Sequence, residues 1–447
     1  MMPAPIGEAL QVPCSNKEGW VSAMCRRIML HTESNGYDFG ICFPIPGGQM
    51  PRQEQIPVQE QMPRQGQLPV QEQMQSQEPL PVQGQLPGSE RVHYYGFSEN
   101  TAREETYDEA LEKRMREIIT DFMPDVLHCF GTEYGHTLAA LRVFGNPEKS
   151  LVGLQGICYK IAEHYLDGIP DEIAKKNTLR DLLKSDNLVR QKEKMGIRGE
   201  REKECFCLTG NVTGRTSFDK ESVKAVNPSA TYHFMNETLR LPFYEGQWKF
   251  SECEEHSIFM SQGNYPVKGL HFVLAALPLL LERFPDTHLY VAGDNIIKDS
   301  FAEKMKISSY GKYLMDLIHE GKLESHVTFL GQLTAVKMKD RMLKSHVFLS
   351  ASTIENSPNS VGEAMLLGVP VVASEVGGVP DILRDGSEGL LYTADNAGAL
   401  NAAIGRVFTA DATRLEAVCE NARRTAKKRH DQDTNYVRLL EIYESLA

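Results

Sequence analysis

The chain has 447 residues, 41% of them hydrophobic, and a net charge of −12 at pH 7. This length predicts two domains with additional segments rather than a single domain. The acidic balance argues against a nucleic-acid binder, which normally presents a basic face, and the nine cysteines, without a C-x-x-C pair, are typical of reduced cytoplasmic thiols. No stretch approaches the ~20 apolar residues of a membrane-spanning helix, and the first thirty residues contain no apolar core of a secretory signal.

The first predicted helix opens at a capping box. Residues 1–13 show no regular pattern, whereas Ser15 and Glu18 have the spacing at which two side chains cap the same helix start. We expect this helix to continue to about His31 and to be followed by a strand over 41–44.

Residues 47–90 differ sharply in composition from the rest of the chain. They repeat a six-residue unit such as PVQEQM, with proline at every sixth position among glutamines. Because proline lacks the N–H that helices and β-ladders require, neither can persist here. We therefore expect a disordered or polyproline-like insertion in a surface loop; a ligand for a proline-reading module is the alternative.

A predicted helix over 107–122 and a buried strand over 126–129 follow the insertion. Glu133 and His136 come soon after this strand. Since parallel sheets place ligands at the carboxyl ends of their strands, both side chains are candidates for acid/base catalysis or acceptor binding. A helix-capping glutamate and an ordinary loop histidine are the alternatives.

Arg215 is a further candidate in the N-terminal half. A strand is predicted over 150–154, and another over 205–208 precedes a run of small residues around Arg215. A guanidinium at this strand end would suit a phosphate or a sugar, and a salt-bridged loop arginine is the alternative. Residues 227–249 lack a strong period and suit a linker between domains.

The C-terminal half alternates regularly between strands and helices, which predicts an α/β domain. Lys268 follows the first of these strands and stands at a helix N-terminus, where its charge can neutralise a diphosphate. The strands are expected at 257–261, 288–292, 327–330, 347–350, 371–374 and 389–392.

The stretch 350–381 combines a strand end, a polar loop, a helix start and a second strand. Ser357 is a suitable N-cap and Pro358 a suitable first helical residue, because proline has no N–H to leave unpaired. Together with the helix dipole, the free amides of the next three residues form a site for an anion such as a diphosphate. These residues are Asn359, Ser360 and Val361.

Two glutamates flank this helix start. Glu363 lies in the first turn, and helical side chains lean toward the N-terminus, so its carboxylate can reach a group beside the phosphate. A ribose diol is a suitable partner, because a carboxylate accepts from two hydroxyls at once. Glu355, in the preceding loop, would face the other end of the same ligand. The alternative is an ordinary capped helix with two exposed acids.

The Glu355–Glu363 spacing, together with Lys268, resembles the E-x7-E signature of the retaining glycosyltransferases of family 4. The resemblance implies the GT-B fold, an α/β architecture of two Rossmann-like domains that face each other across a cleft. It assigns the N-terminal acceptor domain to 1–46 and 91–240, the insertion to 47–90, the nucleotide-sugar domain to 241–430, and a terminal helix that crosses back to the first domain to 431–447.

The resemblance also implies roles for individual residues. Glu363 would hold the nucleotide ribose, and Glu355 would contact the donor sugar as a catalytic residue. The Ser360–Val361 backbone would hold the diphosphate, with Lys268 and Gly19 on the same donor side. Two positions depart from the family's pattern. Gln262 stands where the family usually has an arginine, six residues before Lys268, and Gln155-Gly156 stands near the point where some members carry a histidine that approaches the reacting sugar.

The family's first strand, central in a doubly wound sheet, has no counterpart at the start of this sequence, so we expect an N-terminal domain that lacks it. The implied activity is transfer of a hexosyl group from a UDP- or GDP-sugar to a hydroxyl acceptor, carbohydrate or lipid-linked, with retention of anomeric configuration. We expect a role in polysaccharide or glycoconjugate synthesis, no cofactor or metal, and a cytoplasmic location with peripheral contact at the inner face of the membrane. A non-catalytic homologue and a GT-B-fold epimerase or phosphorylase are the alternatives.

Overall fold

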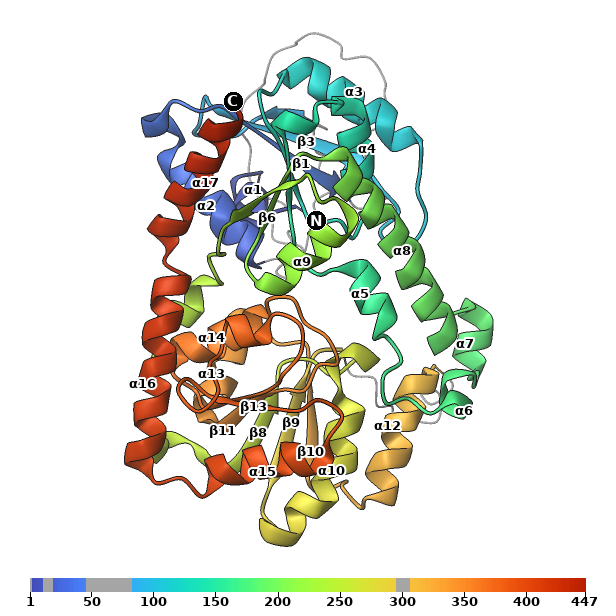
Figure 1. Cartoon of the computed structure of the whole chain (residues 1–447), viewed down its shortest axis with the longest axis vertical. Helices are drawn as coiled ribbons and strands as arrows, with labels where there is room; N and C mark the ends of the chain where they lie inside the picture. Colours follow the sequence, from blue (N-terminus) through green and yellow to red (C-terminus); the bar gives the residue numbers. More distant parts are fainter. Residues whose placement is uncertain (1, 11–18, 46–82, 295–305) are drawn as a thin grey trace, which may run out of the picture.

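The computed structural model describes residues 2–10, 19–45, 83–294 and 306–447, which form two α/β domains stacked along the long axis of the molecule (Figure 1). The predicted α/β class is confirmed. Among the helices in these ranges, none is long and apolar enough to cross a membrane.

A six-stranded parallel sheet forms the core of the C-terminal domain, in the order β10-β9-β8-β11-β12-β13. Parallel strands covered by helices are buried on both faces and therefore read as continuous apolar runs. Ile258, Phe259, Val347 and Phe348 of the two central strands are fully buried. All six predicted strands are present: β8 Glu254–Met260, β9 His288–Ala292, β10 Val327–Gly331, β11 Ser345–Ser350, β12 Val371–Ser374 and β13 Leu390–Tyr392.

The winding of this sheet reverses between β8 and β11. The chain moves outward from β8 to β10 on one side and from β11 to β13 on the other. In open α/β sheets, ligands bind beyond the carboxyl ends of the strands at such a switch point. Helices α10 (Leu270–Arg283) and α14 (Asn359–Leu367) follow the two central strands. The other α-helices among the described residues of the domain are α12 Ser309–Glu320, α13 Ala335–Lys344, α15 Ala397–Phe408 and α16 Ala412–Arg429.

The strands of the N-terminal domain form two separate sheets. One contains the parallel strands β4-β5-β6-β7, and the other has the order β1-β3-β2, with only β2 antiparallel. Within the described ranges no ladder joins β1 to β4, as expected for a Rossmann-like domain without its central strand. The bounds are β1 Phe39–Ile45, β2 Gln83–Gln85, β3 Val92–Ser98, β4 Leu127–Phe130, β5 Ser150–Gly153, β6 Asn211–Gly214 and β7 Thr231–Phe234.

Helices cover both N-terminal sheets, and one of them comes from the far end of the chain. Helix α17 (Gln432–Leu446) continues from α16 along one side of the molecule and lies beside α2 (Gly19–Asn35) (Figure 1). Tyr436, Leu439 and Ile442 of α17 are buried against α2 and the sheet. The other long helices here are α3 Ala110–Phe122, α4 Gly135–Phe144 and α9 Ser217–Val226.

Two predictions near the N-terminus are wrong. Part of the segment predicted to be irregular forms helix α1 (Ala4–Leu10), with Ile6 fully buried. The predicted insertion ends before residue 83, because β2 pairs with β3 and Leu86 is only 2% exposed. Residues 47–82 of the insertion, and the capping box at Ser15 and Glu18, lie outside the described residues.

The prediction of a strand at 205–208 is also wrong. These residues form the last turn of helix α8 (Leu188–Leu208), and the strand is β6, three residues farther along the chain. Cys205 and Phe206 are buried on the same helix face as Glu202. A short apolar run fits a buried helix turn as well as a strand, so periodicity alone could not separate them.

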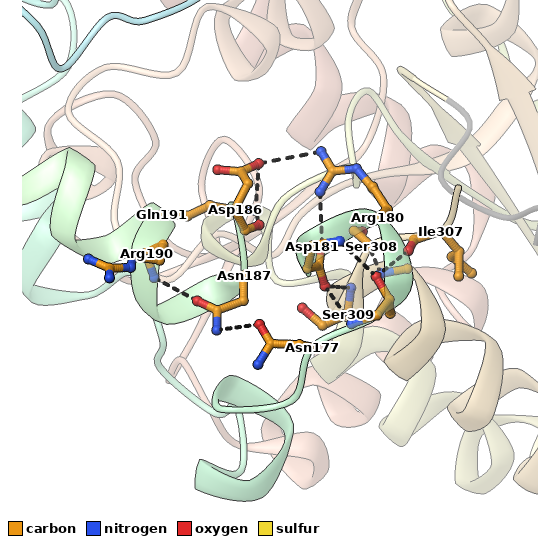
Figure 2. Close-up of polar contacts among 12 residues, drawn as sticks. Asn177, Arg180, Asp181, Asp186, Asn187, Arg190, Gln191, Ile307, Ser308 and Ser309 are labelled. Carbon is orange, nitrogen blue, oxygen red and sulfur yellow. Dashed lines mark hydrogen bonds and ion pairs between the residues drawn. The ribbon is translucent and has the colours of Figure 1, made fainter. Parts of the chain in front are cut away.

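Four helices form an arm that reaches from the N-terminal domain to α12 of the other domain (Figure 1). Asp181 of the arm is buried and accepts a hydrogen bond from the Ser309 N–H at the start of α12 (2.8 Å), and Thr178 donates to the Ile307 carbonyl (2.7 Å). Figure 2 shows this junction, in which Arg180 also pairs with Asp181 (2.9 Å). The arm consists of α5 Cys158–Glu163, α6 Asp171–Ala174, α7 Leu179–Lys184 and α8.

We expect Asp181→Ala to destabilise the protein by about 1–3 kcal/mol, because it leaves the buried Ser309 amide without its acceptor. Urea denaturation would measure the loss. Asp171→Ala is the matched control, since Asp171 is an exposed acid of the same arm in an exposed pair with Lys175, worth about 0–0.5 kcal/mol. Equal midpoints for the two variants would contradict the role of Asp181.

Candidate active site

A cavity of about 750 Å³ lies between the two domains, beyond the carboxyl ends of β8 and β11. Both domains, the arm and the linker contribute to its lining. Of the ten residues predicted to act in catalysis or donor binding, seven line it: Gly19, Arg215, Lys268, Glu355, Asn359, Ser360 and Glu363. Val361, Glu133 and His136 do not.

The start of α14 lies in the cavity wall, one residue later than predicted. Pro358, not Ser357, is the N-cap, and its carbonyl accepts from the N–H groups of Val361 (3.0 Å) and Gly362 (3.3 Å). The Val361 amide is therefore already bonded, which corrects its predicted role in anion binding. Asn359 and Ser360 occupy the first two helical positions, where N–H groups have no acceptor within the helix. Two amides, rather than three, are available to an anion.

Lys268 and Glu355 meet in the cavity as an ion pair. Gly269 follows Lys268 with φ +70°, and a Cβ there would lie 1.8 Å from the Ala351 carbonyl oxygen, so only glycine lets the Lys268 loop approach the end of β11 so closely. Burial alone would lower the pKa of Lys268, but Glu355 and Tyr265 outweigh it and raise that pKa. The ammonium is therefore charged at neutral pH.

Glu363 is held by an arginine that sequence reasoning missed. Arg240, in the linker, donates from Nε and Nη2 to the two Glu363 carboxylate oxygens, at 2.6 Å each. Glu363 is only 2% exposed; burial raises its pKa, and Arg240 opposes that shift. The alternative of two exposed acids is excluded, since both glutamates are enclosed and paired with cations.

No spacing rule could have linked Arg240 to Glu363, because 123 residues separate them and the linker has no regular period. The contact depends on how the linker crosses the cavity. Gly19, the first residue of α2, adjoins this crossing: a Cβ there would lie 2.2 Å from Arg240 Cγ. Gly19 lines the cavity and lies against the arginine stem; its predicted donor contact stays a prediction.

Arg215 is salt-bridged, which was the alternative to a ligand contact. It forms a buried ion pair with Glu237 and donates to the Leu154 carbonyl (3.2 Å). Burial raises the pKa of Glu237, and Arg215 opposes this shift. Gln155 donates to Glu237 (2.6 Å), as does Asn359 at the start of α14 (3.3 Å). The network joins the N-terminal domain to the wall of the cavity.

Glu133 and His136, the predicted acid/base candidates, lie behind that wall. Glu133 accepts from the Gly156 N–H (3.2 Å), and Gly156 rather than Glu133 faces the cavity. His136 Nδ1 lies 2.7 Å from Glu99, which also accepts the His136 backbone N–H (3.2 Å). Burial alone would raise the pKa of Glu99, but its bonds to His136 lower it. Both residues therefore have structural partners. Neither alternative holds either, because no side chain caps α4 and His136 is the second residue of that helix rather than a loop residue.

The sequence of the family described as "Glycosyl transferases group 1" matches residues 246–429. The match lies within the C-terminal half and covers less than half of the chain. The predicted relationship to this class of enzymes is confirmed, and the matched residues include Lys268, Glu355 and Glu363.

One relative is the phosphatidyl-myo-inositol mannosyltransferase of Mycolicibacterium smegmatis, which is 28% identical over 191 residues. The match covers 42% of this chain and 45% of that protein, so this chain spans about half the length of the curated relatives that it matches.

Solved structures extend the likeness to both domains. Sucrose-phosphate synthase from Thermosynechococcus elongatus has a TM-score of 0.59 at 15% identity, covering 82% of this chain and 86% of that one. Anabaena Alr3699/HepE, solved in complex with UDP-glucose, has a TM-score of 0.55 at 18% identity, covering 79% and 86%. At these identities the likeness concerns the fold, and the predicted GT-B fold is confirmed.

Glu202 of α8 is a buried glutamate outside the cavity lining, and it accepts hydrogen bonds from Thr132 (2.6 Å) and the Tyr159 N–H (3.1 Å). Burial raises its pKa from 4.5 to about 7, against the opposing effect of these bonds. Stability that depends on this group is therefore complete below about pH 4.5 and is lost as the pH rises through about 7.

We expect Glu202→Gln, which is always neutral, to remove this pH dependence. The unfolding free energy of the wild type should fall by about 3 kcal/mol relative to the variant between about pH 4.5 and pH 8, as measured by urea denaturation across that range. Glu200→Gln alters an exposed acid of the same helix, paired with Lys203, and should show no such slope. A constant difference between wild type and Glu202→Gln would contradict the prediction.

Proposed function

We propose that this protein is a retaining glycosyltransferase that transfers a hexosyl group from a UDP- or GDP-sugar to a hydroxyl acceptor. The observation that carries the proposal is the cavity at the switch point of the C-terminal sheet, within the match to group 1 glycosyltransferases, where Lys268, Glu355 and Glu363 surround the start of α14. The cation and the helix amides suit the phosphate groups of a nucleotide-diphospho-sugar, and the carboxylates suit its hydroxyl groups.

The diphosphate would lie against the start of α14. The amides of Asn359 and Ser360 and the positive end of the helix dipole favour an anion there, and Lys268 supplies a full charge in the same cavity. Negative charge grows on the diphosphate as the glycosidic bond breaks, so donors fixed in advance lower the barrier. We propose that these groups stabilise the leaving group without a metal ion or other cofactor.

The two carboxylates would bind the hydroxyl groups on either side of the diphosphate. Glu363 lies just beyond the first turn of α14, not within it as predicted, and suits the ribose diol. Glu355, in the preceding loop, suits the donor sugar. A carboxylate that exchanges its cation partner for hydroxyl groups remains hydrogen-bonded, as a buried acid requires.

A glycoconjugate or polysaccharide acceptor is the further part of the proposal. A relative named for mannosyl transfer to phosphatidyl-myo-inositol supports a lipid-linked or carbohydrate acceptor, and the UDP-glucose complex of a protein with this fold supports a UDP-sugar as donor. We place this reaction in the cytoplasm, at the inner face of the membrane.

The test is release of nucleoside diphosphate from a panel of UDP- and GDP-sugars by the purified protein. We expect Lys268→Ala to lower kcat by about 10²–10³, the usual effect of removing one donor that stabilises developing charge. Addition of EDTA should leave the rate unchanged. Failure of the wild type to bind or consume any of these sugars would overturn the proposal.

Glu363→Ala should raise the Kd of the nucleoside diphosphate by about 10- to 100-fold, because hydrogen bonds to a charged group contribute about 1.5–3 kcal/mol. Isothermal titration calorimetry measures the change. Glu375→Ala, which removes an exposed acid outside the cavity, is the control and should bind as the wild type does. Unchanged affinity in Glu363→Ala would remove the ribose role of this residue.

A protein that binds nucleotide sugars without transferring them is the second candidate. It is favoured by the two separate N-terminal sheets and by the position of Glu133 and His136 outside the cavity. Calorimetric binding without release of nucleoside diphosphate would select it. Conversion of one UDP-sugar into another without an acceptor would instead indicate an epimerase.

A further inference from the structure

Two of the cation–carboxylate pairs in the cavity involve the carboxylates assigned to the donor. Lys268 with Glu355 is one, and Arg240 with Glu363 is the other, and all four side chains line the same space. Three of these residues already have a part in the proposed donor site. Arg240 does not, although it is bonded directly to the carboxylate assigned to the ribose.

Arg240 is held in place by contacts from several elements. Its stem packs against Gly19 at the start of α2, its guanidinium lies 4.7 Å from the centre of the Phe243 ring, and Nη2 lies 3.2 Å from Met338 Sδ of α13. Its side chain is nevertheless 22% exposed, compared with 3% for Glu363. Arg240 is therefore the more accessible member of the pair.

The bidentate geometry has a chemical consequence. Both Glu363 oxygens accept from the guanidinium, and these are the oxygens that a ribose diol would use. A guanidinium binds phosphate with the same planar fork that it offers to a carboxylate. A ligand that carries a diol next to a phosphate can therefore satisfy both members of the pair when it separates them.

Other cavity cations are less able to make this exchange. Arg215 is 3% exposed and paired with Glu237, and Arg198 is paired with Glu104 at 2.5 Å. Lys160 is paired with Glu163 on the arm. Only Arg240, among these, has its partner on α14 itself, the helix whose first two amides would receive the diphosphate.

We propose that Arg240 is a second diphosphate-binding residue, and that donor binding exchanges the Arg240–Glu363 pair for a Glu363–ribose contact and an Arg240–phosphate contact. The proposal rests on the proposed function. It makes Arg240 a determinant of specificity: a nucleoside has to separate the pair without offering a phosphate to the arginine, whereas a nucleoside diphosphate replaces both contacts.

The test compares Arg240→Gln with the wild type by calorimetry, using uridine with UDP and guanosine with GDP. We expect the variant to bind the diphosphate at least tenfold more weakly and the nucleoside equally well or more tightly. The Kd of the nucleoside divided by the Kd of the diphosphate should therefore fall at least tenfold. Arg240→Lys keeps the charge but not the fork, and should move the ratio in the same direction by a smaller factor. Arg27→Gln removes an arginine of α2 that pairs with Asp433 (2.8 Å) outside the cavity, and should leave the ratio unchanged.

Equal changes in the Kd values of nucleoside and diphosphate, or no change in either, would overturn the proposed exchange. A merely structural arginine would affect the affinity for both ligands alike. If Arg240→Gln does not fold, as judged by its circular dichroism, Arg240→Lys decides the question by the same ratio. A wild type that binds neither UDP nor GDP would instead overturn the proposed function, so the two failures are distinguishable.

Discussion

The pairing of β8 with β11 is the constraint on which the rest of the site depends. Ile258 lies opposite Val347 and Phe259 opposite Phe348, and all four side chains are fully buried. Register is strongly specified where strands are buried, so the carboxyl ends of these two strands are held side by side. The Lys268 loop leaves one strand and the Glu355 loop leaves the other. Residues 87 positions apart therefore meet as an ion pair in one cavity.

Polar contacts, rather than an apolar seam alone, bring the N-terminal domain to this cavity. Asn356 donates to the Gln155 carbonyl (2.9 Å), Thr216 donates to Asn356 (2.8 Å), and the Arg215–Glu237 pair lies next to them. Buried ion pairs add little net stability, but removal of one partner is costly. They therefore favour one relative placement of the domains. The arm and α17 support the same placement from two other sides of the molecule.

The C-terminal domain could be predicted to within a few residues because buried parallel strands are continuous apolar runs between clear turn signals. The cavity residues Lys268, Glu355 and Glu363 could also be located, since a helix start after a strand has a local signature. Predictions failed where local pattern was ambiguous or absent. The apolar run at 205–208 ends a helix, and β2 has no apolar pattern because its order comes from pairing with β3 and from burial of the adjacent Leu86. The partners of His136 and Glu363 could not be predicted, because Glu99 and Arg240 reach them only through tertiary packing.

The paired charges of the cavity bear on which anions it can accept. An open cluster of cations would attract phosphate of any kind, but here each of the cations beside α14 already neutralises an enclosed carboxylate. An anion without hydroxyl groups that displaced Glu355 or Glu363 from its cation would leave that carboxylate unpaired, and an unpaired buried charge is expensive. A ligand with hydroxyl groups on both sides of a diphosphate avoids that penalty at both ends. The paired acids thus favour anions that also carry hydroxyl groups. The selectivity of the site follows from this pairing rather than from the net charge of the cavity.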